Sequence, residues 1–486
     1  MDNRRASAAV AVALLAISCA PRATPVTPRL PPPPIVRAPD TATAAAVPQP
    51  PADPEPPPTV LPTIRGGARA RAGAAPVPVG RSGLTASLSG PWDVVARVAV
   101  GWRISAASFS GLADWTLEYP GGEGRAVRVP ANQTWSMVAV GSQLRVQPGS
   151  GAAHPATRST VVLRPASSQD AILYAGKRYR GELRVSPTDS GLLIMNRIGV
   201  EDYLRGVVPL EIGNRPPAEL AAAQAQAITA RSYVYVRVRS RRGAQFDIVS
   251  DVREQVYGGV EAERPVTDEA VASTVGLGLF YDGQLIDAPY HSTCGGSTAA
   301  ASEVWRTGTD LPYLRAVSDR IPGTDRFWCD ESPTFRWTRT MEQRDVNAAI
   351  ARYLRQYATG APADPGAVRD LVEGSRTSSG RLGSLSVVTQ RGSYVLRGND
   401  MRFVLRTPSG QILNSTDVSV STTRGTGGVL SRAVFRGGGN GHGIGMCQWG
   451  AIGRARAGRS AQEILAAYYV GTNVARVNES DLRSPR

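Results

Sequence analysis

Residues 216–240 read PPAELAAAQAQAITARSYVYVRVRS, and this stretch predicts a long helix. Pro216 and Pro217 suit the first turn, because proline fixes the backbone angle φ and the first N–H groups of a helix have no intrahelical acceptor. Apolar side chains then recur every third or fourth residue, at Leu220, Ala223, Ala227, Ala230, Val234 and Val238. That spacing places them along one face, so we expect a helix with a buried stripe.

Strand patterns and helix patterns follow one another on both sides of this stretch. Strands are expected at 179–185, 192–198, 279–281, 284–290, 385–388 and 393–396, and helices at 267–275 and 346–357. Asp282-Gly283 is typical of a two-residue β-hairpin turn, and Ser460 with Glu463 forms the capping box of a last helix. The sequence therefore predicts an α+β domain over residues 172–474 and a short C-terminal tail over 475–486.

Residues 1–19 have the pattern of an export signal. Arg4 and Arg5 precede an apolar run from residue 8 to 17, which has the length of a secretory signal core and is too short for a membrane-spanning helix. Small residues then precede Cys19, as in the lipobox of bacterial lipoproteins. An ordinary cleavage site beside an unrelated cysteine is the alternative. We expect an exported, periplasmic protein with a lipid on Cys19 that anchors it in the outer membrane.

Residues 20–80 are too poor in apolar side chains to form a core. Residues 21–80 hold 18 of the 37 prolines, and a chain of this kind extends by roughly 3.1 Å per residue where it is polyproline-like. We expect a disordered tether. Residues 84–165 follow with short β-prone runs between Gly and Pro. They predict a small β-rich domain, which is either a binding module or a structural extension.

The composition is that of a globular protein with a basic surface. Of the 486 residues, 42% are hydrophobic and 20% are charged, which excludes a fully disordered chain and a polytopic membrane protein. The net charge is +15, and Lys177 is the only lysine. A basic surface favours an anionic polymer or lipid, but export removes nucleic acid from the candidates.

Two stretches are unusual, YHSTCGG at 290–296 and GNGHGIGMCQWGA at 439–451. Each contains one of the three histidines, His291 in the first and His442 in the second. Glycine at alternate positions of the second stretch allows its backbone to approach a ligand or another chain segment closely. No Lys-Ser or Lys-Thr follows these glycines, so the stretch is not a phosphate-binding P-loop.

Six motifs in this order resemble the stage II sporulation protein D family, also called the SpoIID/LytB family. They are Arg180-Gly181, GVVPLE at 206–211, QAITARSY at 226–233, QVYGG at 255–259 and the two histidine stretches. The resemblance implies a peptidoglycan lytic transglycosylase that cleaves glycan strands stripped of their stem peptides. It makes Glu211 the catalytic acid and residues 172–474 the catalytic domain.

The neighbours of Glu211 favour the same role, because Leu210 and Ile212 are apolar and an apolar environment raises the pKa of a carboxyl. Most glycosidases need two carboxylates. A lytic transglycosylase needs one, because the 6-hydroxyl of the same muramic acid attacks its own anomeric carbon and leaves a 1,6-anhydro end. The residues expected to bind the sugar are Arg231, Ser232, Tyr233, His291, Ser292, His442, Gln448 and Trp449.

The cysteines other than Cys19 leave three alternatives. In the first, Cys294 and Cys329 form a disulfide, as an oxidising compartment allows. In the second, Cys294, Cys329 and Cys447 bind zinc together with a histidine, either His291 or His442. In the third, the thiols stay free. Zinc occurs in some members of the family, although the spacing here matches no compact zinc motif. We expect no required cofactor, with zinc as the alternative. A Cys-His hydrolase that uses Cys294 is a further alternative, without a known nucleophile signature.

A non-catalytic function competes with the enzyme. The LytB part of the family name suggests a wall-binding module that enhances an N-acetylmuramoyl-L-alanine amidase. The expected partners are therefore peptidoglycan glycan strands in both cases and a cell-wall amidase in the second. The membrane is contacted only through the lipid on Cys19.

Overall fold

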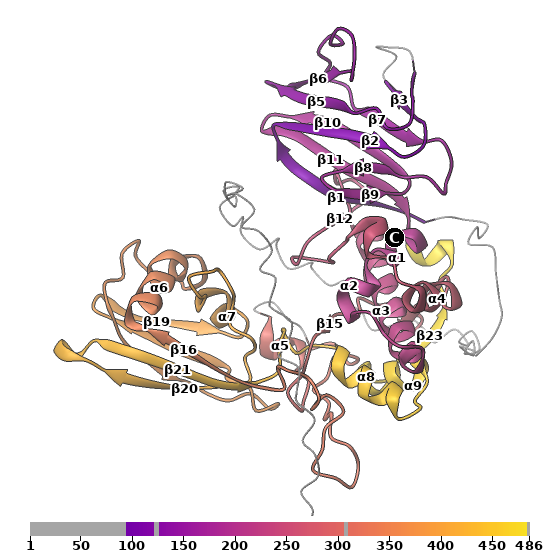
Figure 1. The fold of residues 1–486 in the computed structure, drawn as a ribbon. Coiled ribbons are helices and arrows are strands. Elements are labelled where there is room, and N and C mark those ends of the chain that lie inside the picture. Colours follow the sequence, from indigo (N-terminus) through magenta and orange to yellow (C-terminus); the bar gives the residue numbers. More distant parts are fainter. Residues whose placement is uncertain (1–93, 121–125, 306–309, 484–486) are drawn as a thin grey trace, which may run out of the picture. The chain divides into compact units, whose positions relative to one another are not determined.

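The computed structural model describes residues 94–120, 126–305 and 310–483. Helices and strands are mixed along the chain (Figure 1), which confirms the predicted α+β class. The predicted signal peptide, Cys19 and the tether lie outside the described residues. Each helix in the described ranges is too short or too polar to cross a membrane.

Two largely antiparallel sheets form the first part of the described chain. Their orders are β12-β1-β11-β10-β7-β3-β4 and β6-β5-β2-β8-β9. The strands are β1 (Val95–Ile104), β2 (Ala106–Gly111), β3 (Trp115–Glu118), β4 (Val127–Val129), β5 (Trp135–Val140), β6 (Gln143–Gln147), β7 (Val161–Pro165), β8 (Ile172–Tyr174), β9 (Lys177–Tyr179), β10 (Glu182–Thr188), β11 (Gly191–Gly199) and β12 (Ile248–Val249). Buried and less buried residues alternate along β2 and β3, because successive side chains of a strand point to opposite faces.

These sheets cross the predicted domain boundary. β1 pairs with β11 from Val95 opposite Gly199 to Ile104 opposite Leu192, and β2 pairs with β8. Strands at 172–199 therefore complete the sheets of the leading segment. The predicted division between 84–165 and 172–474 does not follow the sheets, because the local strand pattern does not reveal which distant strand is the partner.

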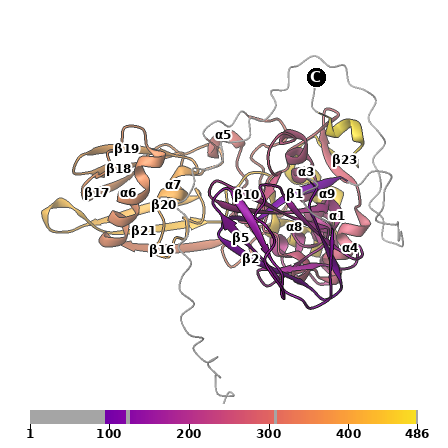
Figure 2. The same cartoon turned by 90° about the horizontal axis from the view of Figure 1, so that it is seen from above.

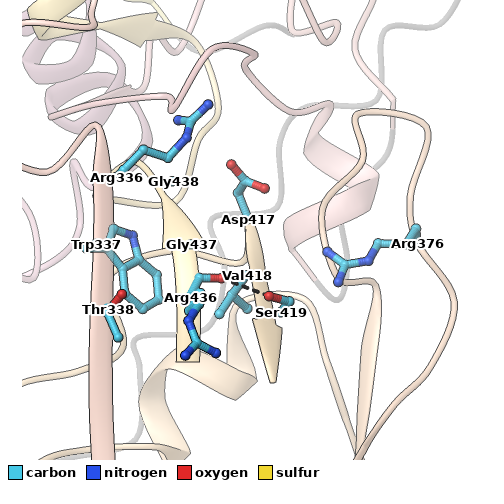
Figure 3. Close-up of a pocket in the computed structure, with 10 residues that line it drawn as sticks. All are labelled: Arg336, Trp337, Thr338, Arg376, Asp417, Val418, Ser419, Arg436, Gly437 and Gly438. Atoms are coloured by element: carbon cyan, nitrogen blue, oxygen red, sulfur yellow. Dashed lines mark hydrogen bonds between the residues drawn. The ribbon is translucent and has the colours of Figure 1, made fainter. Parts of the chain in front are cut away.

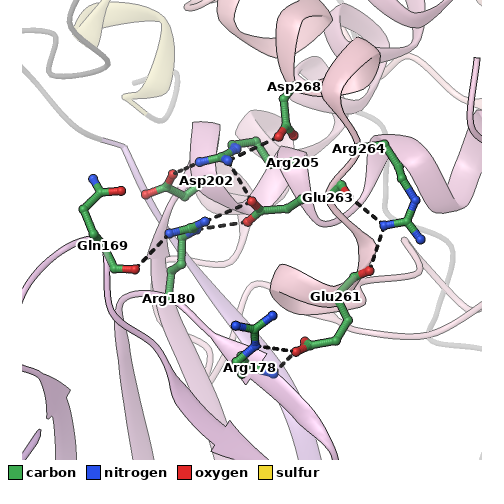
Figure 4. Close-up of polar contacts among 9 residues, drawn as sticks. All are labelled: Gln169, Arg178, Arg180, Asp202, Arg205, Glu261, Glu263, Arg264 and Asp268. Atoms are coloured by element: carbon green, nitrogen blue, oxygen red, sulfur yellow. Dashed lines mark hydrogen bonds and ion pairs between the residues drawn. The ribbon is translucent and has the colours of Figure 1, made fainter. Parts of the chain in front are cut away.

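An ion-pair network links these strands to the helices that follow (Figure 4). Arg180, just after β9, pairs with Glu263 at 2.9 Å, and Arg205 of α1 (Val200–Arg205) pairs with the same carboxylate at 2.7 Å. Arg205 also reaches Asp268 of α4 (Pro265–Ser273) at 3.2 Å. The side chains of Arg180 and Glu263 are 12% and 11% exposed, so solvent screens this pair less than an ion pair on the surface.

The predicted long helix is α3 (Leu220–Ser240), and a 3₁₀ turn at Pro217–Glu219 precedes it. It packs on α2 (Val208–Ile212), α4, α8 (Gln448–Arg456), α9 (Ala461–Tyr468) and β13 (Leu277–Tyr281). Residues 222–232 and 234–237 are all buried, so the helix is covered on every side and not only along the predicted stripe. Its many alanines allow the neighbouring elements to approach closely.

The predicted hairpin and capping box are both present. β13 pairs with β14 (Gln284–Leu285), and Asp282 and Gly283 between them have φ angles of 49° and 68°. Ser460 caps α9 together with Glu463. The other edge of β13 pairs with β23 (Asn473–Arg476). Val477 and Leu482 are buried and a 3₁₀ turn spans Glu479–Leu482, so the described part of the predicted tail packs on the domain.

Residues 336–438 form a unit with a hydrophobic core of its own, separate from the core of the preceding sheets and helices. Two sheets, β16-β21-β20 and β17-β18-β19, pack with two helices (Figures 1 and 2). The elements are β16 (Arg336–Glu342), α6 (Gln343–Tyr357), β17 (Val368–Glu373), β18 (Ser384–Thr389), β19 (Gly392–Arg397), α7 (Asp400–Val404), β20 (Val418–Arg424) and β21 (Leu430–Gly438). The sequence predicted the helix and two of these strands but not a separate unit, which we call the inserted unit.

Candidate active site

The two histidine stretches meet in a short parallel pairing. β15 (Tyr290–His291) pairs with β22 (Met446–Cys447), and His291 lies opposite Cys447. Beyond the strands, Thr293 and Asn440 exchange two backbone hydrogen bonds of 3.0 and 2.8 Å. The two stretches are far apart in the sequence and side by side in the fold. A short helix, α5 (Ala301–Val304), follows the first of them.

The glycines of the second stretch are required where the two stretches touch. Every glycine from residue 439 to 445 has a positive φ angle, which residues with a side chain rarely adopt. A Cβ atom on Gly441 would lie 2.7 Å from the Cβ of His291, and a Cβ on Gly445 would overlap the carbonyl of Pro289. The expected close approach is confirmed, and what approaches is another segment of the chain.

Glu211 is a half-buried residue of the short helix α2. The backbone N–H of Val256 donates to its Oε1 at 3.1 Å, and the side chains of Tyr290 and Gln448 also hydrogen-bond to the carboxyl. No cation of the described residues forms an ion pair with it. Burial is the largest influence and raises its pKa from 4.5 to about 7. Both the protonated and the ionised form are therefore populated at neutral pH.

A second layer of polar side chains holds Tyr290 and Gln448. Gln255 donates from Nε2 to the hydroxyl oxygen of Tyr290 at 3.1 Å, and its Oε1 accepts a hydrogen bond from Tyr203 at 3.2 Å. Gln448 donates from Nε2 to Oε1 of Gln226 at 3.2 Å. Because the Tyr290 oxygen already accepts from Gln255, its own proton is available for the carboxyl of Glu211.

The sequence identified Gln448 as a site residue but missed Tyr290, Gln255 and Gln226. The signal was present, since Tyr290 directly precedes His291 and the two glutamines open two of the quoted motifs. Spacing along the chain does not show which residue of a motif points toward the carboxyl.

Both histidines are neutral and connect backbone segments. The N–H of Ile444 donates to Nδ1 of His442 at 3.1 Å, so Nε2 carries the proton and donates to the carbonyl of Tyr290 at 2.9 Å. Nδ1 of His291 donates to the carbonyl of Ile444 at 3.1 Å. Burial lowers the pKa of His442 to about 3 and that of His291 well below its ordinary value. His442 thus positions Tyr290, and the N–H groups of both rings already donate to backbone carbonyls, which leaves neither of them for the predicted contact with sugar.

Arg231 and Ser232 belong to the core, which corrects their predicted contact with substrate. The guanidinium of Arg231 is fully buried and pairs with Glu201 of α1 at 2.6 Å. Its remaining N–H groups donate to Thr274 and to backbone carbonyls of α4 and β13. The Oγ of Ser232 accepts from the N–H of Leu279 at 2.9 Å. These bonds fix α3 to its neighbours and leave no donor for a ligand.

Tyr233, Ser292 and Trp449 have partly exposed side chains. The guanidinium of Arg237 lies over the ring of Tyr233, 4.0 Å from its centroid. The backbone N–H of Trp449 donates to the carbonyl of Ser292 at 3.1 Å, so these two residues are adjacent. A contact of these three residues with sugar stays a prediction.

The remaining cysteines converge with an acid that the sequence did not indicate. Cys294, Cys329, Cys447 and Asp319 are buried, and their sulfur and carboxylate oxygen atoms all lie within 4.8 Å of one another. The Sγ atoms of Cys294 and Cys329 are 3.5 Å apart, in contact and not bonded. Neither His291 nor His442, the two predicted alternatives for a fourth ligand, is in this group, and Asp319 lies there instead. Cys294 is 1% exposed, too buried to serve as the nucleophile of a hydrolase.

A groove of about 630 Å³ lies on the inserted unit (Figure 3). Its lining does not include Glu211 or the side chains that hydrogen-bond to Glu211. Its lining is Arg336, Trp337, Thr338, Arg376, Asp417, Val418, Ser419, Arg436, Gly437 and Gly438. Three arginines against one aspartate make the groove basic. None of the predicted site residues lines it.

Comparison with known proteins shows which families and relatives this chain resembles. A family described as "Stage II sporulation protein" matches residues 188–281, and a domain of unknown function matches 323–445. The chain is 28% identical over 316 residues to an uncharacterised protein of Brachyspira hyodysenteriae, covering 64% of this chain and 76% of the relative. It is 27% identical over 296 residues to stage II sporulation protein D of Bacillus subtilis, covering 58% and 75%.

The amidase enhancer of Bacillus subtilis is 28% identical over 305 residues, which cover 56% of this chain and 40% of that protein. The first family match, 188–281, contains Glu211 and α3, while the second, 323–445, contains the inserted unit. The expected resemblance is therefore confirmed for residues 188–281, which match the stage II sporulation protein family, and proteins of that name are among the relatives of this chain.

Proposed function

We propose that this protein is a peptidoglycan lytic transglycosylase in which Glu211 is the general acid and base. The observation that carries the proposal is a half-buried carboxyl with a pKa of about 7 and uncharged polar partners. A catalytic group that must give and then take a proton works best with a pKa near the working pH. The amidase enhancer and stage II sporulation protein D among the relatives support a role in the cell wall.

In the proposed reaction, protonated Glu211 donates its proton to the glycosidic oxygen that leaves C1 of a muramic acid residue. The 6-hydroxyl of the same residue attacks C1, and the carboxylate accepts the proton of that hydroxyl. The bond to the next sugar breaks, a 1,6-anhydro bond forms, and no water is consumed. Because the nucleophile belongs to the substrate, one carboxyl is enough.

Tyr290 and Gln448 position the carboxyl in this scheme. Each of them forms a hydrogen bond with the carboxyl of Glu211, and these bonds lower the pKa of Glu211 while burial raises it. The balance between the two effects leaves the pKa near neutrality. Ser292, Trp449 and Tyr233 are the proposed contacts of the sugar, because their side chains are partly exposed.

An envelope location belongs to the same proposal. A lipid on Cys19 and the proline-rich tether at 20–80 hold the domain in the periplasm within reach of the glycan strands. Labelling cells with a palmitate analogue tests the anchor: the full chain should carry the label and Cys19→Ser should not. An unlabelled wild-type protein would reject lipidation.

A non-catalytic amidase enhancer is the second candidate, because one relative carries that name. It predicts glycan binding and stimulation of an N-acetylmuramoyl-L-alanine amidase, both independent of Glu211. The environment of Glu211 favours the enzyme, because a half-buried carboxyl without a counter-ion costs stability and glycan binding alone does not need such a group.

Incubation of the full-length protein with glycan strands stripped of stem peptides tests the two candidates. Mass spectrometry should detect 1,6-anhydromuramic acid ends. Glu211→Gln should slow their formation by roughly 10²- to 10⁴-fold. Glu479→Gln is the matched control, because Glu479 is 70% exposed. If the wild type forms no anhydro ends and Glu211→Gln still stimulates the amidase, the enhancer function replaces the enzyme.

A further inference from the structure

The groove on the inserted unit is lined from three directions (Figure 3). β16 contributes Arg336, Trp337 and Thr338, while Arg376 reaches the groove from the loop between β17 and β18. The end of β21 and the start of β20 lie between them. The volume of about 630 Å³ falls within the range of about 300–1,000 Å³ that is typical of ligand sites.

Two consecutive glycines keep this space open. Gly437 and Gly438 end β21, and neither has a positive φ angle, so the backbone does not require glycine there. A Cβ on Gly437 would lie 2.5 Å from Cζ2 of Trp337. A Cβ on Gly438 would lie 2.6 Å from Oδ2 of Asp417 and 2.9 Å from Nη1 of Arg336. Glycine weakens a strand and often marks a site that a ligand approaches closely, and side chains at these positions would fill the groove.

The positive charge of the groove is only partly neutralised. Arg376 pairs with Glu373 at 2.7 Å. Arg336 donates to two backbone carbonyls and Arg436 to a side-chain hydroxyl, and neither forms an ion pair with a carboxylate of the described residues. All three arginine side chains are exposed. A guanidinium group binds a carboxylate through two parallel hydrogen bonds, so these arginines favour a ligand that carries carboxylates.

The other lining groups fit a sugar. The half-buried indole of Trp337 has no hydrogen-bond partner for Nε1 among the described residues. Thr338 and Ser419 bring hydroxyls, and the carboxyl of Asp417 accepts no hydrogen bond from the part of the chain that the structure describes. A sugar ring has apolar C–H groups on its faces and hydroxyls at its edge, so it matches an aromatic surface that has polar groups beside it.

The groove adjoins the two histidine stretches. Gly438 is followed directly by Gly439, where the second stretch begins. Nη1 of Arg336 donates to the carbonyl of Gly295, in the first stretch, at 2.8 Å. The side chains that hydrogen-bond to Glu211 come from these same stretches. A polymer in the groove would therefore lie beside the segments that carry the partners of Glu211.

We propose that this groove binds the glycan strand of peptidoglycan through the lactyl carboxylates of its muramic acid residues, which are free once the stem peptides are removed. Arg436 and Arg376 pair with a carboxylate, and Trp337 lies against a neighbouring sugar ring. One carboxylate for every two sugars suits a few arginines around an aromatic ring. The inference rests on the proposed function, because it takes the occupant to be the strand on which Glu211 acts.

Binding to the full-length Glu211→Gln protein, which should not cleave the strand, tests the groove. Glycan strands stripped of stem peptides are compared with chitin oligosaccharides, which lack the lactyl carboxylate. The glycan strands should bind at least fivefold more tightly at low salt, and added salt should reduce the difference. Adding Arg436→Gln should weaken glycan binding roughly fivefold and leave chitin binding unchanged. Arg344→Gln is the matched control, because the Arg344 side chain is 91% exposed and lies outside the groove.

The comparison of the two ligands does not depend on how the Arg436 variant folds. Equal affinity for both ligands would overturn the proposal, and so would an Arg436→Gln protein that binds glycan strands as tightly as the Arg344→Gln control. Polyglutamate is a third ligand, and if it binds as tightly as the glycan strands, the groove takes acidic polymers in general and the proposal fails. Cleavage is not measured in these experiments. A protein that binds as expected but forms no 1,6-anhydro ends would therefore reject the reaction and keep the binding site.

Discussion

The raised pKa of Glu211 predicts how the stability of the protein depends on pH. Burial moves this pKa from 4.5 to about 7 in the folded state. A difference of about 2.5, at about 1.36 kcal/mol for each pKa unit, corresponds to about 3 kcal/mol. The folded state binds more protons than the unfolded state between these two pKa values. Its stability therefore decreases as the pH rises from about 4.5 to 7, and this contribution is lost above that window.

Glu211→Gln removes the titrating group and keeps an oxygen acceptor for Val256. Below about pH 4.5 the wild-type carboxyl is protonated in both states, so the variant and the wild type should differ little through this effect. Above pH 7 the variant should be more stable by about 3 kcal/mol. The difference between the two proteins isolates Glu211, because the other titrating groups are common to both.

Urea unfolding of the full-length proteins, followed by tryptophan fluorescence between pH 4 and 8, measures this difference. Glu479→Gln, an exposed residue, controls for the loss of one negative charge. A difference that does not change with pH would refute the raised pKa, and with it the argument that Glu211 is protonated near neutrality. If Glu211→Gln is more stable than the wild type and still loses its activity, the loss comes from catalysis and not from unfolding.

Three other substitutions test the site and its support. Tyr290→Phe removes a hydrogen bond that lowers the pKa of Glu211; the midpoint of the pH–rate profile should rise by about one pH unit, and an unmoved midpoint would contradict the contact. Gly441→Ala, at φ 114° and against His291, should cost about 1–3 kcal/mol of unfolding free energy. Gly427→Ala, at φ 75° in open space, measures the backbone part alone, so equal losses would exclude the clash. Arg231→Met leaves Glu201 without its partner and should cost about 3–5 kcal/mol by thermal unfolding. Adding Glu201→Gln should recover part of that loss, and a single variant as stable as the wild type would disprove the buried pair.

Local patterns predicted the elements whose signals lie within a few residues. The prolines before α3, the Asp282-Gly283 turn and the Ser460 capping box all form as expected. Each depends on the backbone preference of one or two residues and on their immediate neighbours. The burial of α3 on every side could not be read in this way, because it depends on which elements pack against the helix.

Long-range pairings explain the predictions that failed. The sheets join strands before residue 165 to strands after 172, and no local pattern records such a pairing. Arg231 was predicted to bind sugar because it lies in a quoted motif, yet its partner is Glu201, thirty residues earlier in the chain. Asp319 had no motif around it, and only the fold brings it to the cysteines.

The pairing of β15 with β22 gives a physical reason for the two histidine stretches. Tyr290 and Gln448 reach Glu211 from the two stretches, so the geometry of the carboxyl depends on how closely these segments approach. Glycines at positive φ permit the approach, and His442 fixes the carbonyl of Tyr290. The buried cysteines lie close by, with Cys447 at the end of β22 and Cys294 three residues after β15. Cys447 and Gln448 are consecutive, and the first faces the thiols while the second faces Gln226. Because the two residues are adjacent in the chain, we expect the position of the Cys447 sulfur to influence that of the Gln448 amide.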